Sequence, residues 1–92
     1  MNTQPAWAMA VRTMVYPIMF SVNPVDEVDR VLEQLMEKAT VKRNWHQMLE
    51  SLRSALASES KLSETMSQVH SEAVIRAYLT KVSIALESKL SS

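Results

Sequence analysis

The chain has 92 residues, and its ten basic and ten acidic side chains give a formal net charge of zero, so the positive field that drives binding to nucleic acids is missing. Cysteine is absent, which excludes disulfides, thiolate zinc sites and thiol catalysis and favours a cytoplasmic location. The length predicts one domain, residues 1–92, with a single core.

Glycine is absent as well, which removes phosphate-binding loops, dinucleotide-binding turns and the nucleophile elbow of hydrolases. Tight hairpins also lose their usual positive-φ residue. Helices joined by short polar links depend least on positive φ, and good helix formers are plentiful in this chain. The predicted fold class is therefore all-α, a compact bundle of about four helices near residues 5–16, 24–39, 43–58 and 61–90.

Thr3 and Pro5 predict where the first helix, residues 5–16, begins. Threonine is a favourable N-cap, and proline is tolerated in the first turn because its missing N–H has no intrahelical partner there. Pro17 disfavours helical geometry in the residue before it and clashes with the preceding turn. We therefore expect a stop or a kink near Tyr16.

The segment from residue 6 to residue 20 is apolar on nearly every helical face. A helix of this kind is normally buried, so we expect it at the centre of the bundle. Alternatively, Trp7, Met14 and Tyr16 belong to a surface for a partner protein or for a second copy of the chain, because methionine and aromatic side chains suit interfaces. A membrane partner is not expected, since the segment is too short to span a bilayer and lacks the lysine-rich face of a surface helix.

The second helix, residues 24–39, has the clearest start signal in the chain. Asn23 is a preferred N-cap, Pro24 stands at the first helical position, and Asp26 falls three residues after the cap. Apolar residues then recur at steps of three and four, which predicts one buried stripe. The stripe consists of Val25, Val28, Leu32, Leu35, Met36 and Ala39.

The third helix, residues 43–58, repeats this pattern, and the fourth, residues 61–90, has two stripes on different faces. The stripe of the third helix consists of Trp45, Met48, Leu49, Leu52, Ala55 and Leu56. The stripes of the fourth consist of Leu62, Met66, Val69 and Ala73, and of Ile75, Leu79, Val82, Leu86 and Leu90. A bend and a break near His70 explain the change of face equally well.

Four carboxylates of the second helix form a ridge beside its apolar stripe, hereafter the acidic ridge: Asp26, Asp29, Glu33 and Glu37. Like charges one helical turn apart cost about 0.2 to 0.5 kcal/mol per pair, so helix stability alone does not favour this arrangement. One interpretation is a docking surface for a protein with a basic surface. The other is a solvated face, interrupted by Arg30 and Lys38 or neutralised by Lys42 and Arg43 folding back on it.

No catalytic or metal-binding residues are predicted. His46 and Glu50 lie one helical turn apart, but a zinc site needs further ligands, and only His70 or scattered carboxylates could supply them. Serine is abundant, yet the chain offers no elbow turn on which a hydrolytic triad could be built. We therefore expect a non-enzymatic protein without a cofactor.

No motif assigns the chain to a family. Small, neutral, cysteine-free helical proteins with an acidic ridge recur among bacterial immunity proteins, which bind a cognate toxin and block its active site, and this resemblance is an analogy at the level of the fold. This resemblance implies a cytoplasmic protein that binds and inhibits a toxin, and a basic nuclease is the toxin that the acidic ridge would fit. The alternative is a helical chaperone or structural subunit, similar to secretion chaperones. Its apolar first helix and long last helix would then pack against another helical protein.

Overall fold

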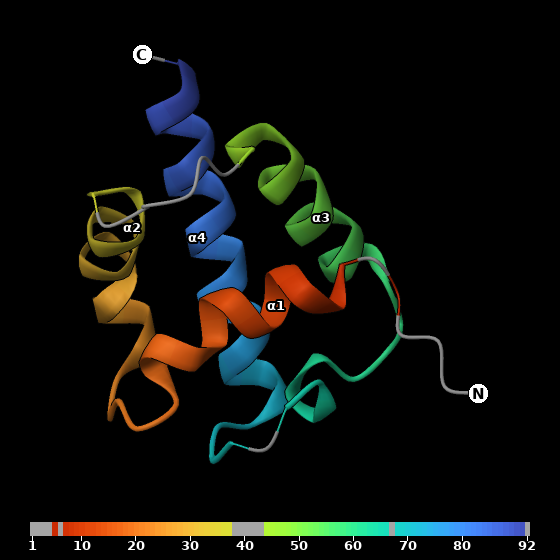
Figure 1. The fold of residues 1–92 in the computed structure, drawn as a ribbon. Helices are drawn as coiled ribbons and strands as arrows, with labels where there is room; N and C mark the ends of the chain where they lie inside the picture. The colour runs from red at the N-terminus through yellow and green to blue at the C-terminus, as the bar shows by residue number, and fades with distance from the viewer. Residues whose placement is uncertain (1–4, 6, 38–43, 67, 92) are drawn as a thin grey trace.

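Helices account for all the regular structure that the computed structural model shows in the residues it describes, which are 5, 7–37, 44–66 and 68–91. The α-helices are α1 (Ala8–Val15), α2 (Val28–Glu37), α3 (Trp45–Ala57) and α4 (Glu72–Ser91), and the short 3-10 helices are η1 (Tyr16–Ile18), η2 (Pro24–Glu27) and η3 (Leu62–Glu64). The predicted all-α bundle is therefore confirmed (Figure 1).

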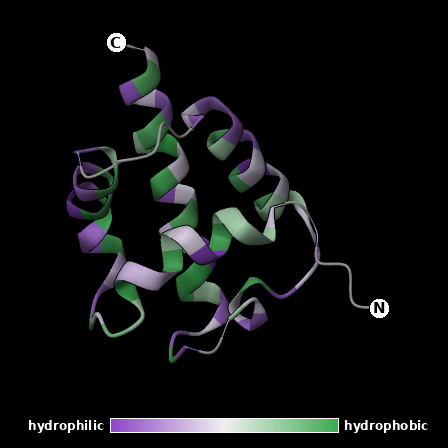
Figure 2. Cartoon of the chain, viewed as in Figure 1, coloured by the Kyte–Doolittle hydropathy of each residue, from purple (hydrophilic) through white to green (hydrophobic). Residues whose placement is uncertain are grey.

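The central helix of this bundle is α4. The other three α-helices all pack against it, with α2 and α3 on opposite sides and α1 crossing over it (Figure 1). Figure 2 shows apolar bands along α4, and Ile75, Tyr78, Leu79, Val82 and Leu86 are all fully buried. Burial of this apolar surface is the main favourable contribution to the stability of the bundle.

α1 buries one face rather than all of them. Val11, Met14 and Val15 are buried, whereas Met9 and Tyr16 are each 70% exposed. α1 is therefore not wrapped on every side as expected. Its apolar composition did not indicate which face packs, because that choice depends on where α3 and α4 lie.

Pro5 and Pro17 predict the two ends of α1, and only the prediction from Pro17 is confirmed. Pro5 precedes the helix, and its carbonyl accepts a hydrogen bond from the N–H of Ala8 (3.0 Å), so the predicted start at residue 5 is wrong. Thr3, the predicted cap, lies outside the described residues. The predicted stop near Tyr16 is confirmed, because α1 ends there and the chain continues as η1. Pro17 has no N–H for the next α-helical hydrogen bond.

The second helical segment begins at Pro24 as predicted, but as the 3-10 helix η2, and it becomes α-helical only at Val28. The side chain of Asn23 does not accept a backbone hydrogen bond as predicted; its Nδ2 donates to Oδ2 of Asp26 (2.7 Å). The carbonyl of Asn23 accepts from the N–H of Asp26 (3.1 Å), which closes a 3-10 turn. The predicted end of this helix, at residues 38 and 39, lies outside the described residues.

α3 carries the side-chain cap that α2 lacks. Oδ1 of Asn44 accepts a hydrogen bond from the N–H of Gln47 (3.1 Å) and satisfies one donor of the first turn. The predicted stripe is confirmed, since its central members Met48, Leu49 and Leu52 are buried.

The predicted fourth helix is broken near His70, so the structure decides between the two alternatives. η3 and α4 are separate helices, and His70 lies just before α4. Its ring Nε2 donates to the carbonyl of Ile18 in η1 (2.8 Å), and its backbone N–H donates to Oε1 of Gln68 (2.5 Å). These contacts hold the break against the end of α1.

Arg76 of α4 satisfies carbonyl groups at the end of α3. It donates to the carbonyl oxygens of Leu56 (3.0 Å), Ser58 (2.8 Å) and Ser60 (2.8 Å). Many helices satisfy their last carbonyls through a left-handed residue, usually glycine. In this chain Ser58 is extended instead (φ −75°, ψ 149°), and the arginine supplies the missing donors.

Glu72 holds the other side of this connection. Its carboxylate accepts from the N–H groups of Leu62 (3.0 Å) and Ser63 (2.8 Å) and from Nε of Arg76 (2.7 Å). Burial by itself would raise the pKa of Glu72, but the hydrogen bonds from Ser63, Leu62 and Arg76 outweigh it and hold this pKa below its ordinary value. The two side chains, hereafter the Glu72–Arg76 clamp, fix the connection without any positive-φ residue in the described chain.

Tyr78 connects α4 to the end of α1 inside the core. Its hydroxyl donates to the carbonyl of Met14 (2.7 Å), and burial raises its pKa. Buried Ser83 likewise donates to the carbonyl of Leu79 (2.9 Å). Within the described part of the chain, every buried side-chain nitrogen and oxygen has a hydrogen-bond partner, as a stable core requires.

The described chain is compact. Its radius of gyration is 12.5 Å, close to the value of about 12 Å expected for a folded chain of this length. Across the described ranges, no helix combines the length and apolar character that crossing a membrane requires.

Candidate functional site

The structure brings the acidic ridge together on the outer face of α2. Val28, Val31 and Leu32 are buried against the rest of the bundle, while all four ridge carboxylates, Asp26, Asp29, Glu33 and Glu37, are exposed. Asp26 belongs to η2, and the other three follow along α2. The predicted residues therefore share one surface.

Among the described residues, the acidic ridge has few partners. Arg30 pairs with Glu27, which is not a ridge residue, and donates to Oε1 of Gln34 (3.2 Å). Within the described ranges, Asp29 and Glu33 form no ion pair, and neither does Glu37. Lys38, predicted to interrupt the ridge, and Lys42 and Arg43, predicted to fold back on it, lie outside the described residues.

The three predicted partner residues of the N-terminal segment differ in their exposure to solvent. Met14 is fully buried, so its side chain belongs to the core and not to a docking surface as predicted. Trp7 is half-buried and packs against the core. Tyr16 is 70% exposed and stays available to a partner.

Two further exposed residues were not predicted as site residues. Phe20 is 86% exposed and Val22 is completely exposed. They lie in the connection between η1 and η2, after Pro17 and before Asn23. Their position in a connection between helices could have indicated their exposure, because such connections run over the protein surface even when their residues are apolar.

These residues line an open groove beside the acidic ridge, hereafter the Phe20 groove, of about 570 Å³. Its lining residues are Pro17, Phe20, Ser21, Val22, Asn23, Asp26, Glu27 and Arg30. Figure 2 shows the connection after η1 as mainly apolar and α2 with both hydrophilic and hydrophobic bands. Because Asp26 belongs to both, the groove and the ridge form one continuous surface.

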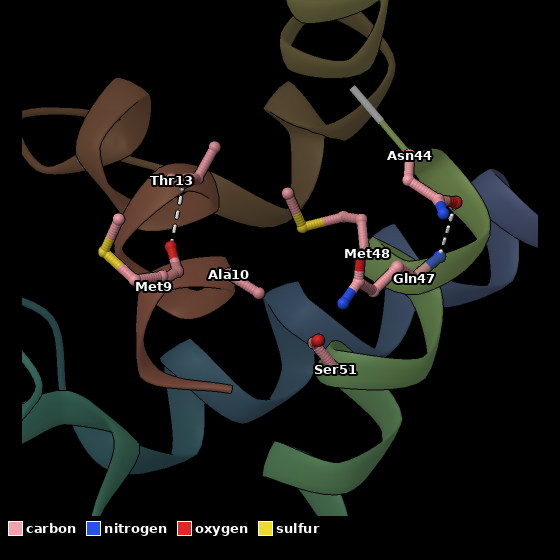
Figure 3. Close-up of a pocket in the computed structure, with 7 residues that line it drawn as sticks. All are labelled: Met9, Ala10, Thr13, Asn44, Gln47, Met48 and Ser51. Carbon is pink, nitrogen blue, oxygen red and sulfur yellow. Dashed lines mark hydrogen bonds between the residues drawn. The ribbon is translucent and has the colours of Figure 1, made fainter. Parts of the chain in front are cut away.

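A second hollow, hereafter the α1–α3 hollow, has a volume of about 240 Å³ (Figure 3). Its lining consists of Met9, Ala10, Thr13, Asn44, Gln47, Met48 and Ser51. Met48 reaches from α3 toward α1, with Gln47 and Ser51 on the α3 side. The hydroxyl of Thr13 donates to the carbonyl of Met9 (2.8 Å), so this polar group is already satisfied. The lining carries no charge.

The structure places the two histidines in different environments. His46 and Glu50 are exposed, and the Nε2 of His70 is bonded to Ile18. Over the described ranges, no cluster of three or more histidine, cysteine or acidic side chains could hold a metal ion.

Comparisons of the chain with known protein families, with curated proteins and with solved structures gave no match.

Proposed function

We propose that the protein is a non-enzymatic binding protein, and that the acidic ridge and the Phe20 groove together dock a protein partner with a basic surface. The observation that carries this proposal is the exposed ridge. Asp29, Glu33 and Glu37 are solvent-exposed and have no ion-pair partner in the described chain. Their mutual repulsion disfavours α2 by about 0.2 to 0.5 kcal/mol per pair, and a basic partner would remove that cost.

The neighbouring apolar residues could supply the binding energy that a charged face alone does not provide. Surface charges mainly increase association rates, whereas most binding energy comes from a few apolar and aromatic anchors. Phe20 and Tyr16 are exposed aromatic side chains, and Phe20 lines the groove that also contains Asp26. An anchor region beside a charged region is the usual anatomy of a protein interface.

Within this class, we favour an immunity or antitoxin-type inhibitor that covers the active site of a nuclease toxin in the cytoplasm. Nucleases bind phosphate backbones through lysine and arginine, so their active-site surfaces are basic. A surface such as the acidic ridge is complementary to them in charge.

The test is affinity capture from the native host with the full chain as bait, followed by assay of the purified partner. We expect a basic protein whose nuclease activity is abolished by an equimolar amount of the wild-type chain. The variant Glu33→Lys/Glu37→Lys should need at least about tenfold more protein for the same inhibition, since close charge pairs contribute more than 1.4 kcal/mol.

The matched control is Glu59→Lys/Glu64→Lys, which makes the same charge change on exposed residues away from α2. The control should inhibit like the wild type. Equal inhibition by both double variants, or a partner without nuclease activity, would contradict the proposed inhibitor.

A second candidate, a chaperone or structural subunit for another helical protein, is favoured by the α1–α3 hollow. Met9 is 70% exposed at its edge, and methionine adapts readily to the surface of a partner helix. The variant Met9→Lys distinguishes the two candidates. It should abolish binding if a partner helix lies in this hollow and leave binding unchanged if the acidic ridge is the docking face.

A further inference from the structure

We propose that the Phe20 groove receives an arginine side chain from an exposed segment of the partner protein. This inference rests on the proposed function, because it assigns a specific contact to the surface that contains the acidic ridge. It follows from the exposed aromatic ring of the groove, from the charged residues in its lining and from the arginines of the chain itself.

The groove presents an aromatic side chain from a well-anchored connection. Phe20 is 86% exposed and Val22 is fully exposed, while buried Ile18 and Pro24 fix the two ends of their segment. The N–H of Ser21 also donates to the carbonyl of Ile18 (3.0 Å). The phenyl ring is therefore held at the surface, where its face is available to a cation.

The charges of the groove identify that cation. Glu27 is already paired with Arg30, so Asp26 is the carboxylate of the groove without an ion-pair partner among the described residues. One of its oxygens accepts from Asn23 (2.7 Å), and the residue is exposed. A guanidinium can stack its flat face on a ring and still donate from its edge to a carboxylate, whereas an ammonium group cannot do both in this way.

A second copy of the chain does not offer this arginine from its described residues. Arg12 donates to the carbonyl of Thr65 (3.1 Å), and Arg30 and Arg53 pair with glutamates. Arg76 belongs to the Glu72–Arg76 clamp. These four described arginines are engaged within the fold, and Arg43 lies outside the described residues. We therefore assign the arginine to the basic partner of the proposed function.

The test is a titration of the ¹⁵N-labelled full chain with the peptide acetyl-Leu-Arg-Leu-amide, followed by NMR. Matched peptides carry lysine or citrulline in the central position. We expect saturable shifts at Phe20, Val22 and Asp26 with the arginine peptide, and at least about twofold weaker binding of the other two.

Two substitutions locate the contact. Phe20→Ala and Asp26→Asn should each weaken binding of the arginine peptide by about two- to fivefold, the size of an exposed cation–aromatic or charge contact. Val69→Ala, which alters a similarly exposed apolar residue (79%) outside the groove, should leave it unchanged. None of the three residues is part of the core, so the fold should survive each change.

Three results would overturn the proposal: equal binding of the three peptides, shifts centred away from the groove, or no loss of affinity in Phe20→Ala. The outcome is separable from that of the proposed function, which is tested at Glu33 and Glu37 with the whole partner. If those reversals weaken inhibition while Phe20→Ala does not, the docking face stands and the arginine contact is wrong.

Discussion

Asn44 and Asn23 both precede a helical segment, yet only one of them caps it with a side chain. Oδ1 of Asn44 accepts from the backbone of Gln47, while the side chain of Asn23 donates to Asp26 at the surface. An orphan backbone donor costs more to leave unsatisfied than an exposed pair of side chains. The two asparagines should therefore differ in their contribution to stability.

We predict that Asn44→Ala lowers the free energy of unfolding by about 1 kcal/mol, the usual cost of losing an N-cap. Asn23→Ala is the matched comparison and should cost less than about 0.5 kcal/mol, as an exposed side-chain contact does. Urea denaturation of both variants and the wild type measures the difference. An equal loss in the two variants would show that the capping assignment is incorrect.

Glu72 gives the fold a predictable dependence on pH. Its folded pKa lies below its unfolded value, which is near 4.5. The carboxylate therefore stabilises the fold above that pH, and the contribution is lost as the pH falls through the folded pKa. In Glu72→Gln this contribution is absent at every pH.

We predict that the unfolding free energies of wild type and Glu72→Gln differ by a constant amount near neutral pH and converge below about pH 4.5. Denaturant titrations at a series of pH values measure this convergence. Glu59→Gln, at an exposed residue outside the clamp, should remain parallel to the wild type. A difference that does not change with pH would contradict the clamp.

At the scale of the elements, α2 and α3 are held by one apolar face each. Leu32 and Leu52 lie at the middle of these faces and are completely buried. Removing a large buried side chain loses its transfer free energy and leaves a cavity in a close-packed core. Both helices depend on α4 for this burial, because each packs directly against it.

We predict that Leu32→Ala and Leu52→Ala each lower the free energy of unfolding by about 2 to 5 kcal/mol. Ile84→Ala, at a residue of α4 that is 66% exposed, should change it by no more than about 0.5 kcal/mol. Thermal or urea unfolding gives all three values. A loss below about 1 kcal/mol for either leucine would place that residue outside the core.

The sequence predicted α2 and α3 well because each has a single apolar stripe, and one stripe on a helix defines the buried face. It did not predict the outer face of α1 or the exact break before α4. Met14 and Met9 carry the same side chain, but Met14 is buried and Met9 is exposed. Only the positions of α3 and α4 relative to α1 determine which of the two is buried. The break depends on contacts of Glu72 with Leu62 and of Arg76 with Leu56. The spacing of apolar residues in the sequence does not predict such contacts.

The candidate site was predicted in part for the same reason. The acidic ridge follows helical spacing, so the sequence alone places Asp29, Glu33 and Glu37 on one helical face. Phe20 and Val22 lie outside any helix. A connection has no regular spacing of side chains, so the sequence pattern does not indicate whether an apolar residue there is exposed or buried. Their exposure depends on how η1 and η2 are anchored to the bundle.

At the scale of the whole molecule, the net charge is zero but the charged residues are unevenly distributed along the chain. The segment Pro24–Glu37 holds five acidic residues and only Arg30 as a base, so nine of the ten basic residues lie elsewhere in the chain. With zero net charge, a chain of this kind has no overall field that attracts a partner from a long distance. It can still orient a basic partner toward one face, because charges within about 10 Å of the approaching surface dominate at moderate ionic strength.

The central claim is that this acidic face docks a basic partner, and the association rate measured against ionic strength tests it most directly. The full chain and the variant Glu33→Lys/Glu37→Lys are compared with the captured partner by stopped-flow. We expect the variant to associate about tenfold more slowly at low salt and to show a shallower dependence on salt, because steering by surface charge acts on the association rate. Identical rates and identical salt dependence in the two proteins would contradict the claim.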